Sequence, residues 1–582
     1  MTGSFPTQHA STTRFTWLAP LLLTLPVVCF VLFVLIYAVN VPWLDDIDAF
    51  LGFTLAYLDA PTLAGKLHNI LVPNNEHRIV SAKLITLAMY YLTGEVNFRW
   101  LILVALLFSL SAFGLFWGVF RSMRLPLLAF VPVAFLFFQP EYHLTTLWSV
   151  TGLQHPVVIC LTLFALYLLS RTGQADRAYG RVAGAAALQM LATLSMSNGL
   201  MGWLGGGIML ALNRQWRGLG IWTTGCGVTL WIYFHDFQSG TRTGESLGYF
   251  LEHPIATMSA FFTFTGGMFD LTPTASGYLR YVLPTLAGVA LTILVAALVY
   301  QTVQPLLTSR WQQADTGLRQ RRLFFVGSYV FLFANAGIIA VLRLRYGYEV
   351  MVVTNYMIYP ATLAALLYLN LLSEFPNYVA QQRLLRTGLV VGVGIWAFAY
   401  GFYWPQMAYR KQMLLTNAMN QKHTGIGLGP SWGTPFADMA RRVMQESVRR
   451  GIYHYPTSYL SGVESRIWSP TGPSPQTVAA SDSCLNMPIM GGGYSYLTAT
   501  KPNAFPGGIG PAAVLVSSAK HTFLFPSETP YSLGNFWLNR RVTAIDAEII
   551  ISILPPGRYR VGVVTPSLPT PPIRFGCQQI TI

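Results

Sequence analysis

Charged side chains are scarce in this sequence, yet two short stretches near the N-terminus are rich in them. Only 10% of the 582 residues are Asp, Glu, Lys or Arg. The stretch WLDDID contains Asp45, Asp46 and Asp48, and the stretch NNEHRIV contains Glu76, His77 and Arg78. A carboxylate can take a proton from a substrate hydroxyl group, whereas cationic side chains bind phosphate oxygens. Together these residue types indicate a site that combines acid–base chemistry with anion binding.

The adjacent residues Asp45 and Asp46 are the candidate catalytic groups. Repulsion between neighbouring carboxylates raises the pKa of one of them, which helps that carboxylate to accept a proton. We favour Asp46 over Asp45, and a bound Mg²⁺ or Mn²⁺ could recruit both as ligands. The alternative is that these acids are anchors at a membrane surface. Because acids beside a bilayer cost free energy unless a cation or a proton compensates them, a functional role is favoured.

A second polar segment, RLRYGYEVMVVTNYMIYP, begins with two arginines, Arg343 and Arg345. Arginine binds phosphate through a planar fork of N–H donors. We therefore expect a substrate phosphate to be bound by Arg78, Arg343, Arg345 and His77. For Arg343 and Arg345, an ion pair with Glu349 or with the acids of WLDDID is the alternative. We expect the cavity around the substrate to be lined by Glu76, His143, Glu349 and Tyr356.

The elements that must position these residues are membrane-spanning helices. Hydrophobic residues make up 53% of the chain and the mean hydropathy is +0.46, whereas an ordinary soluble domain has roughly 25% charged residues. A span needs about 20 apolar residues, and eleven segments are predicted to be spans: 15–39, 97–120, 125–139, 157–170, 182–197, 199–212, 218–235, 281–300, 323–342, 357–372 and 387–404. The segments 182–197 and 199–212, separated by SNG, could instead form one broken helix or a re-entrant pair.

Arginine is distributed unevenly over the segments between the predicted spans. The loops RSMR, RTGQADRAYGR, NRQWR, QTVQPLLTSRWQQADTGLRQRR and SEFPNYVAQQRLLR all lie on one side. Basic residues collect in cytoplasmic loops, so we expect the N-terminus to be cytoplasmic in an inner (plasma) membrane. The segment 40–96 and the C-terminal region then face the periplasm or the extracellular space. This topology also accounts for the net charge of +15 without nucleic-acid binding.

The composition changes after residue 404, which divides the chain into two predicted domains. Residues 1–404 form a transmembrane domain with a catalytic first outer loop at 40–96, and residues 405–582 form an outer domain. The stretches MAYRKQMLLTNAMNQ and PFADMARRVMQESVRRGIY read as amphipathic helices, and AAVLVSSA, HTFLFP, AEIIISIL and RYRVGVVTP read as strands. The fold class is thus a polytopic α-helical membrane protein with a C-terminal α/β domain that is β-rich at its end.

The chain has five cysteines, and only Cys484 and Cys577 lie in the predicted outer domain. Disulfides form in oxidising compartments outside the cytoplasm. Since no other cysteine lies in that domain, the sequence predicts a disulfide between these two residues.

An apolar first span, an outer loop that opens with an Asp pair, many further spans and a C-terminal outer domain resemble the GT-C superfamily of integral-membrane glycosyltransferases. The resemblance implies a polyprenyl-phosphate-linked sugar as donor, and an acid in the first outer loop as general base or metal ligand. The matching residues here are Asp45 and Asp46. RYGYEVMVVTNYMIYP is similar to a segment of bacterial membrane proteins of this type, which often have Ser-Arg-Tyr where this chain has Thr354, Asn355 and Tyr356.

The resemblance implies a membrane glycosyltransferase that moves a sugar from a polyprenyl-phosphate donor to an envelope glycan, lipid or protein on the outer side of the membrane. The short arginine-rich loops contain no Walker A or Rossmann glycine pattern, so chemistry on nucleotide sugars at the cytoplasmic face is not expected. A transporter or flippase of lipid-linked glycans, or a non-enzymatic envelope assembly protein, is the alternative.

Overall fold

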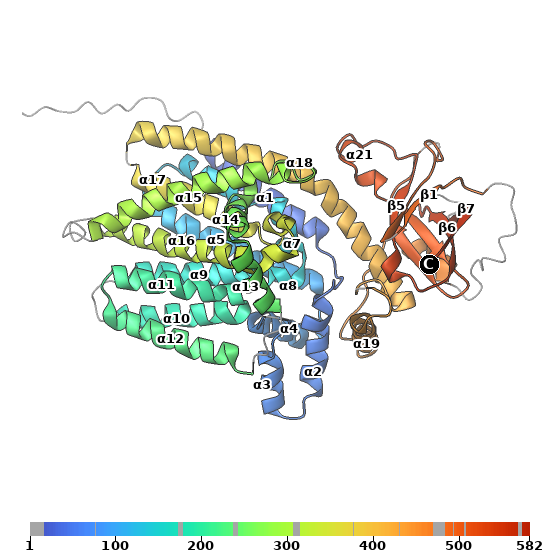
Figure 1. Cartoon of the computed structure of the whole chain (residues 1–582), viewed down its shortest axis with the longest axis horizontal. Helices are drawn as coiled ribbons and strands as arrows, with labels where there is room; N and C mark the ends of the chain where they lie inside the picture. The colour runs from blue at the N-terminus through green and yellow to red at the C-terminus, as the bar shows by residue number, and fades with distance from the viewer. Residues whose placement is uncertain are drawn as a thin grey trace, which may run out of the picture.

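The structure of the chain is a computed structural model in which a bundle of helices carries a small β domain at one end (Figure 1). It describes residues 17–75, 77–172, 178–236, 242–306, 315–375, 377–429, 431–468, 484–492, 494–505, 508–567 and 573–582. Glu76, one of the predicted cavity residues, lies outside these ranges.

Seven helical segments of the described chain are long and apolar enough to cross a membrane. They are α1 (Leu18–Tyr37), α5 (Phe98–Arg121), Leu127–Leu147, Ser149–Ser170, α15 (Leu279–Leu306), α16 (Thr316–Arg343) and α18 (Tyr378–Thr424). Two of these segments are composite: the first contains α6 (Val131–Phe137) and α7 (His143–Leu147), and the second contains α8 (Ser149–Gly152) and α9 (His155–Ser170). The core of the bundle is almost entirely apolar, with many phenylalanine side chains fully buried.

The other four predicted spans are also helical. They form α10 (Ala178–Ser195), α11 (Leu200–Leu212), α12 (Trp216–Phe234) and α17 (Ile358–Glu374). By length and composition, therefore, seven of the eleven predicted spans meet the requirement for crossing a membrane. Two of the others are simply short, since α11 has 13 residues and α17 has 17, fewer than the roughly 20 of a perpendicular span.

The helices α10 and α11 form a hairpin and not one broken helix. They are joined by a single 3₁₀ turn, Ser197–Gly199. A Cβ atom at Gly199 would lie 2.5 Å from backbone atoms of Ala192 and Thr193, so only glycine permits the turn to pack against α10 this closely. The turn places Ser197 and Asn198 at the end of the bundle that carries the first loop.

The predicted domain boundary at residue 404 falls inside α18, a single helix of 47 residues. Residues after 404 are mostly good helix formers such as Met, Ala, Leu and Gln, so the helix continues out of the apolar bundle as far as Gly425. That glycine has a φ of 75° and ends the helix as a left-handed cap. Figure 1 shows α18 running from the bundle to the β domain.

The first loop is largely ordered into short helices. It contains the π-helix η2 (Ile47–Gly52), α2 (Phe53–Asp59), α3 (Leu63–Leu71) and α4 (Val80–Thr93). The region between the spans α12 and α15 contains α13 (Arg242–Glu252) and α14 (Pro254–Thr265).

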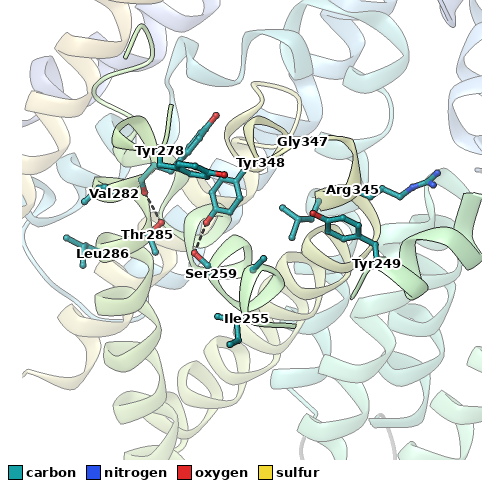
Figure 2. A pocket seen from close by; sticks show the side chains of 13 residues that line it. Tyr249, Ile255, Ser259, Tyr278, Val282, Thr285, Leu286, Arg345, Gly347 and Tyr348 are labelled. Atoms are coloured by element: carbon teal, nitrogen blue, oxygen red, sulfur yellow. Dashed lines mark hydrogen bonds between the residues drawn. The ribbon is translucent and has the colours of Figure 1, made fainter. Parts of the chain in front are cut away.

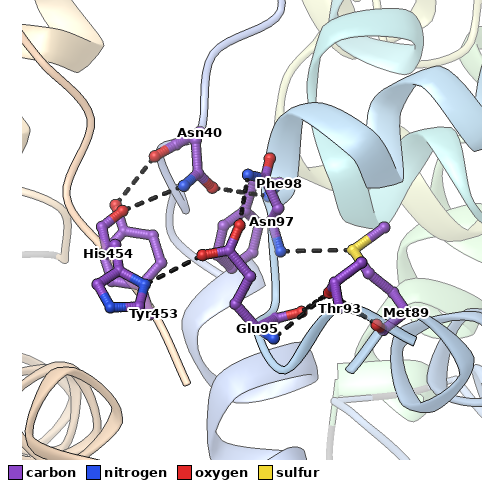
Figure 3. A network of polar contacts seen from close by, with 8 residues as sticks. All are labelled: Asn40, Met89, Thr93, Glu95, Asn97, Phe98, Tyr453 and His454. Carbon is purple, nitrogen blue, oxygen red and sulfur yellow. Dashed lines mark hydrogen bonds and ion pairs between the residues drawn. The ribbon is translucent and has the colours of Figure 1, made fainter. Parts of the chain in front are cut away.

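The C-terminal region holds the first loop against the bundle. Beyond α18 lie α19 (Pro435–Arg449) and α20 (Glu464–Trp468), and α19 packs on η2. Backbone bonds join Leu44 N to Leu428 O at 3.1 Å and Val96 N to Ile452 O at 2.7 Å. In Figure 3, the hydroxyl of Tyr453 donates to the carbonyl of Asn40 at 3.0 Å.

The same network contains an ion pair between the two regions, in which His454 Nδ1 lies 3.0 Å from Glu95 Oε2 (Figure 3). The Asn40 side chain accepts from the backbone N–H of Phe98 at 2.8 Å and donates to the carbonyl of His454 at 3.1 Å. Both ends of the first loop are therefore tied to residues 452–454.

The β domain has two sheets and one shared core. The strands β1 (Ile489–Gly492), β2 (Ser495–Ala499) and β5 (Asp546–Ile550) form one antiparallel sheet in the order β1-β2-β5. The strands β3 (Ala513–Ser517), β4 (Thr522–Pro526), β6 (Arg558–Val564) and β7 (Ile573–Thr581) form the other, in the order β4-β3-β6-β7. Side chains of both sheets, including Val516, Phe523 and Ile549, pack together.

The four predicted strands are present as β3, β4, β5 and β6, and the two predicted amphipathic helices are present as the end of α18 and as α19. A last helix, α21 (Leu533–Trp537), lies between β4 and β5 in the chain. Cys484 and Cys577, the predicted pair, form a disulfide bond across 93 residues of sequence. The bond links the segment before β1 to the last strand.

We expect Cys577→Ser to destabilise the β domain while leaving the helical bundle intact. In the chain-entropy model, closing a loop of this length stabilises a fold by about 4 kcal/mol. Limited proteolysis of the full chain at increasing temperature should cleave the region after residue 484 at a lower temperature in the variant than in the wild type. Cys226→Ser, which changes a free cysteine of α12, is the matched control. Labelling of both Cys484 and Cys577 by a thiol reagent in non-reduced protein would contradict the prediction.

Candidate functional site

Asp46 is fully buried and binds two backbone amides. Its carboxylate accepts hydrogen bonds from the N–H of Trp43 at 3.1 Å and from the N–H of Val150 at 2.9 Å, and only 1% of the residue is exposed. Val150 belongs to α8, so the carboxylate fastens the start of the first loop to the bundle. Leu44, two residues before Asp46, has a φ of 47° at this bend of the chain.

A buried arginine from α18 lies near Asp46 and favours the charged form of its carboxyl group. The Arg410 guanidinium lies over the indole ring of Trp43, 4.7 Å from its centroid, and donates to the carbonyl of Leu147 at 3.3 Å. Burial raises the pKa of Asp46 to about 8, although the two amides and the charge of Arg410 act in the opposite direction. A carboxyl group enclosed in this way cannot reach a substrate unless its hydrogen bonds to the two backbone N–H groups break.

Asp45 and Asp48 are on the accessible side of the same turn. Asp45 is half-buried and bonds to the side chain of Asn75, and Asp48 is exposed and accepts from Asn74 Nδ2 at 2.9 Å. Partial burial raises the pKa of Asp45, and the neighbouring Asp48 charge acts in the same direction, while the bond from Asn75 opposes them. Asp45 is thus a carboxylate with raised basicity that a substrate could reach.

Asn74 and Asn75 do not cap the helix α4 that follows them. The backbone groups of Asn74 and His77 bond to each other at 2.8 and 3.1 Å, and Asn75 adopts a φ of 52°. This tight turn delays the start of α4 to Val80, so His77 and Arg78 precede the helix instead of lying on its first turn. The side chains of Asn74 and Asn75 do not bond to the start of α4. They bond instead to the carboxylates of Asp48 and Asp45.

His77 lies on the inner side of this turn. Its Nδ1 atom is 3.0 Å from the hydroxyl of Ser197, in the turn between α10 and α11. Burial, and to a smaller extent the positive charge of Arg343, lower the pKa of His77 to about 4. The imidazole is therefore neutral at pH 7 and offers one donor and one acceptor to its neighbours.

The opposite wall comes from α9 and from the segment that precedes α17. His155 Nδ1 lies 3.1 Å from the hydroxyl of Tyr359, which also accepts from Asn198 Nδ2 at 3.2 Å. The His155 ring contacts the ring of Tyr356 at a centroid distance of 5.4 Å. Arg343 interacts electrostatically with both His77 and His155. One connected polar cluster, which we call the loop–bundle cluster, thus comprises Asp45, Asp48, Asn74, Asn75, His77, His155, Ser197, Asn198, Arg343, Tyr356 and Tyr359.

Several predicted site residues lie elsewhere or are already engaged. Arg78 is buried and donates to three carbonyl groups, those of Tyr233 at 2.7 Å, Leu71 and His235. It fastens the first loop to α12 and α3. Arg345 pairs with Glu245 of α13.

The predicted cavity residues His143 and Glu349 also lie outside the loop–bundle cluster. His143 is buried beside Tyr403, with ring centroids 5.3 Å apart, and its Nδ1 atom is 3.1 Å from the carbonyl of Pro140. Glu349 lies against Gly347, which has a φ of 121°. A Cβ atom at position 347 would collide with the Glu349 carboxylate. Of the predicted cavity residues that are described, only Tyr356 lies in the cluster.

The predicted Mg²⁺ or Mn²⁺ site does not fit the two aspartates as they are arranged. The Asp46 oxygens point at backbone amides, while the Asp45 carboxylate bonds to Asn75. Within the described residues, no group of three or more His, Cys, Asp or Glu side chains is placed to hold a metal ion. Asp45 and Asp46 therefore do not converge on one cation position.

The residues that follow Arg343 in the chain help to form a groove (Figure 2). Its volume is about 710 Å³, and its lining is mostly apolar. The walls come from α13, α14, the first turns of α15 and residues 344–348, and they include Tyr249, Ile255, Tyr281, Val282, Leu286 and Tyr348. Leu286 and Val282 are 63% and 51% exposed, so the groove opens on the flank of the bundle.

The floor of the groove contains a chain of hydroxyl groups. Tyr348 Oη lies 2.7 Å from Ser259 Oγ and 2.8 Å from Thr263 Oγ1, which lies 2.6 Å from Thr285 Oγ1. Figure 2 shows the Arg345 guanidinium directed away from the tyrosines of the groove. The segment 344–348, which directly follows Arg343 in the chain, forms part of the groove wall.

Sequence reasoning missed the contributions of Ser197, Asn198 and Tyr359. For the first two the signal was present, because SNG interrupts an otherwise apolar segment, and polar groups inside a bundle need partners. What the sequence did not indicate is that these residues meet the first loop, since this depends on the hairpin between α10 and α11.

No family model matches the chain, and no curated protein and no solved structure matches it either.

We expect His77 to make the stability of the protein depend on pH. Its folded pKa of about 4 lies below the value of about 6.5 in an unfolded chain. The unfolded chain therefore binds the proton first as the pH falls, and stability is lost between about pH 6.5 and pH 4. At pH 5 the loss is about 2 kcal/mol.

His77→Gln, which does not titrate, should remove this part of the pH dependence. The measurement is the melting temperature of purified wild type and variant at pH 7 and pH 5. A variant that loses as much stability as the wild type over this interval would show that His77 is not buried as a neutral group.

Proposed function

We propose that the chain is a membrane glycosyltransferase of the GT-C type, which transfers a sugar from a polyprenyl-phosphate-linked donor to a hydroxyl group of an envelope glycan, lipid or protein. The observation that supports this most strongly is the loop–bundle cluster. It contains a carboxylate with a raised pKa, Asp45, and a cation, Arg343, and the residues that follow Arg343 in the chain line a lipid-sized apolar groove. No single one of these features would indicate glycosyl transfer, but the reaction needs all three.

In the proposed reaction, Asp45 and Arg343 have separate roles. The bond between the sugar C1 and the phosphate oxygen breaks, a bond from C1 to the acceptor oxygen forms, and the acceptor hydroxyl loses its proton. Asp45 takes that proton, because its raised pKa makes it a better base than a free aspartate. Arg343 stabilises the charge that develops on the departing polyprenyl phosphate. Asp46 and Arg410 keep the turn of Asp45 in place.

We infer that the cluster faces the periplasm or the extracellular space. The arginine-rich loops lie at the opposite end of the bundle, which by the positive-inside rule is cytoplasmic. The disulfide between Cys484 and Cys577 supports the same orientation, since disulfides persist outside the cytoplasm. The donor is then a lipid in the outer leaflet of the inner (plasma) membrane.

The groove supports a lipid-linked donor over a soluble one. An apolar wall that opens sideways on the bundle suits an isoprenoid chain arriving from the bilayer. Arg343 directly precedes the groove wall at residues 344–348, so the phosphate of such a lipid would lie at Arg343 while its chain occupies the groove. Arg345, paired with Glu245, shapes the rim of the groove and does not contact the phosphate in this proposal.

We expect Asp45→Asn and Asp46→Asn to have different effects. Purified protein in lipid nanodiscs is incubated with a panel of polyprenyl-phosphate hexoses and pentoses and an envelope extract as acceptor, and released polyprenyl phosphate is measured by mass spectrometry. Loss of a general base should slow release about 10²–10⁴-fold in Asp45→Asn, with a melting temperature close to that of the wild type. Asp46→Asn replaces one of the two oxygens that accept from the backbone N–H groups of Trp43 and Val150 with an NH₂ donor, and should cost about 1–3 kcal/mol of stability.

The outcome also separates the proposed enzyme from a flippase. A flippase would move the lipid-linked sugar without releasing polyprenyl phosphate. If the wild type releases none from any donor of the panel, or if Asp45→Asn releases it at the wild-type rate, Asp45 is not the base of a transferase.

We expect Leu286→Trp to impair use of the lipid-linked donor by filling the groove. The variant should raise KM for the donor roughly tenfold, which corresponds to about 1.4 kcal/mol of binding free energy, and should leave kcat near the wild-type value. Ile293→Trp is the matched control, because Ile293 is equally exposed at 65%, lies two turns further along α15 and does not line the groove. Equal KM values for the two variants would remove the groove from the donor site.

A further inference from the structure

The helix α21 of the β domain is attached to the bundle at the point where the apolar part of α18 ends. The indole N–H of Trp537 donates to the carbonyl of Gly401 at 2.8 Å, and the rings of Trp537 and Trp404 lie 6.1 Å apart. Residues 387–404 of α18 are apolar, and polar and basic residues such as Arg410 and Lys411 follow. Figure 1 shows α21 beside this part of α18, between the bundle and the sheets.

Aromatic and basic side chains gather at the same level of the bundle. Trp404 donates through its indole N–H to the hydroxyl of Tyr37, the last residue of α1, at 2.5 Å. Arg99 and Lys411 donate to carbonyl groups of the last turn of α1, at 3.1 and 2.8 Å. Tryptophan and tyrosine are enriched at membrane–water interfaces, and basic side chains extend to the headgroups there. This arrangement marks one interface of the bilayer.

The surface of α21 is apolar although the helix belongs to the β domain. Leu533, Trp537 and Leu538 are 47%, 50% and 63% exposed, and Arg540 follows on the surface. Such a combination of aromatic, aliphatic and basic residues on one short helix is typical of segments that lie in a membrane interface.

We propose that α21 and the turn after it lie in the membrane–water interface, with Leu533, Trp537 and Leu538 in contact with bilayer lipids. The occupant of this apolar surface is the bilayer that surrounds the bundle, because the bond to Gly401 makes the surface continuous with the lipid-facing side of α18. The β domain is thereby held against the membrane surface instead of standing away from it on α18. This inference requires that the bundle spans a membrane, and it is independent of the proposed reaction.

Power-saturation electron paramagnetic resonance tests the proposal on the full chain. A nitroxide label is placed on Leu538→Cys or Leu533→Cys in protein whose free cysteines Cys29, Cys160 and Cys226 have been replaced. The labelled protein is reconstituted in nanodiscs of phosphatidylcholine and phosphatidylglycerol. The control is Tyr494→Cys, which is 94% exposed in the turn between β1 and β2.

Both α21 labels should be relaxed more by oxygen, which partitions into lipid, than by a water-soluble nickel chelate, and the Tyr494 label should show the reverse. Labels on Leu533 and Leu538 that are as accessible to nickel as the Tyr494 label would overturn the proposal. Labels shielded from both relaxants, with dipolar broadening between spins, would also overturn it, because a second copy of the chain would then cover the surface.

Discussion

The buried carboxylate of Asp46 is the contact on which the arrangement of the candidate site depends. It takes hydrogen bonds from Trp43 within its own loop and from Val150 of α8, and it faces the guanidinium of Arg410. Three parts of the molecule meet there: the first loop, the bundle and the helix that carries the β domain. Because burial raises the pKa of Asp46 to about 8, its carboxyl group is mostly protonated at pH 7, and the hydrogen bond from Val150 N–H holds the first loop to the bundle.

This contact gives two adjacent aspartates different tasks. Enclosure of Asp46 leaves Asp45 on the outer side of the turn, where Asn75 orients it and Asp48 raises its pKa. The neighbouring cations differ as well, since Arg410 favours the charged form of Asp46, whereas Arg343 interacts electrostatically with His77 and His155. In our account, the function follows from the separation of an enclosed, structural aspartate from an accessible, reactive one.

Much of the fold could be predicted from the sequence, because long apolar segments and alternating strands depend on local pattern. The eleven predicted segments are all helical, and the strands at AAVLVSSA, HTFLFP, AEIIISIL and RYRVGVVTP are present. The continuation of α18 past residue 404 was missed, since a change in composition marks the end of the apolar environment and not the end of a helix. The choice between Asp45 and Asp46 was beyond the sequence, because it depends on Val150 and Arg410, which are distant in the chain.

The most direct measurement of the central claim is mass spectrometry of envelope glycans, glycolipids and polyprenyl-phosphate sugars from cells with and without the gene. Our account predicts that cells without it lack one sugar on an envelope component and accumulate the corresponding polyprenyl-phosphate sugar. It also predicts that wild-type protein restores the sugar and that Asp45→Asn protein, expressed at the same level, does not. Unchanged glycans and donor lipids without the gene, or full restoration by the Asp45→Asn protein, would contradict the account.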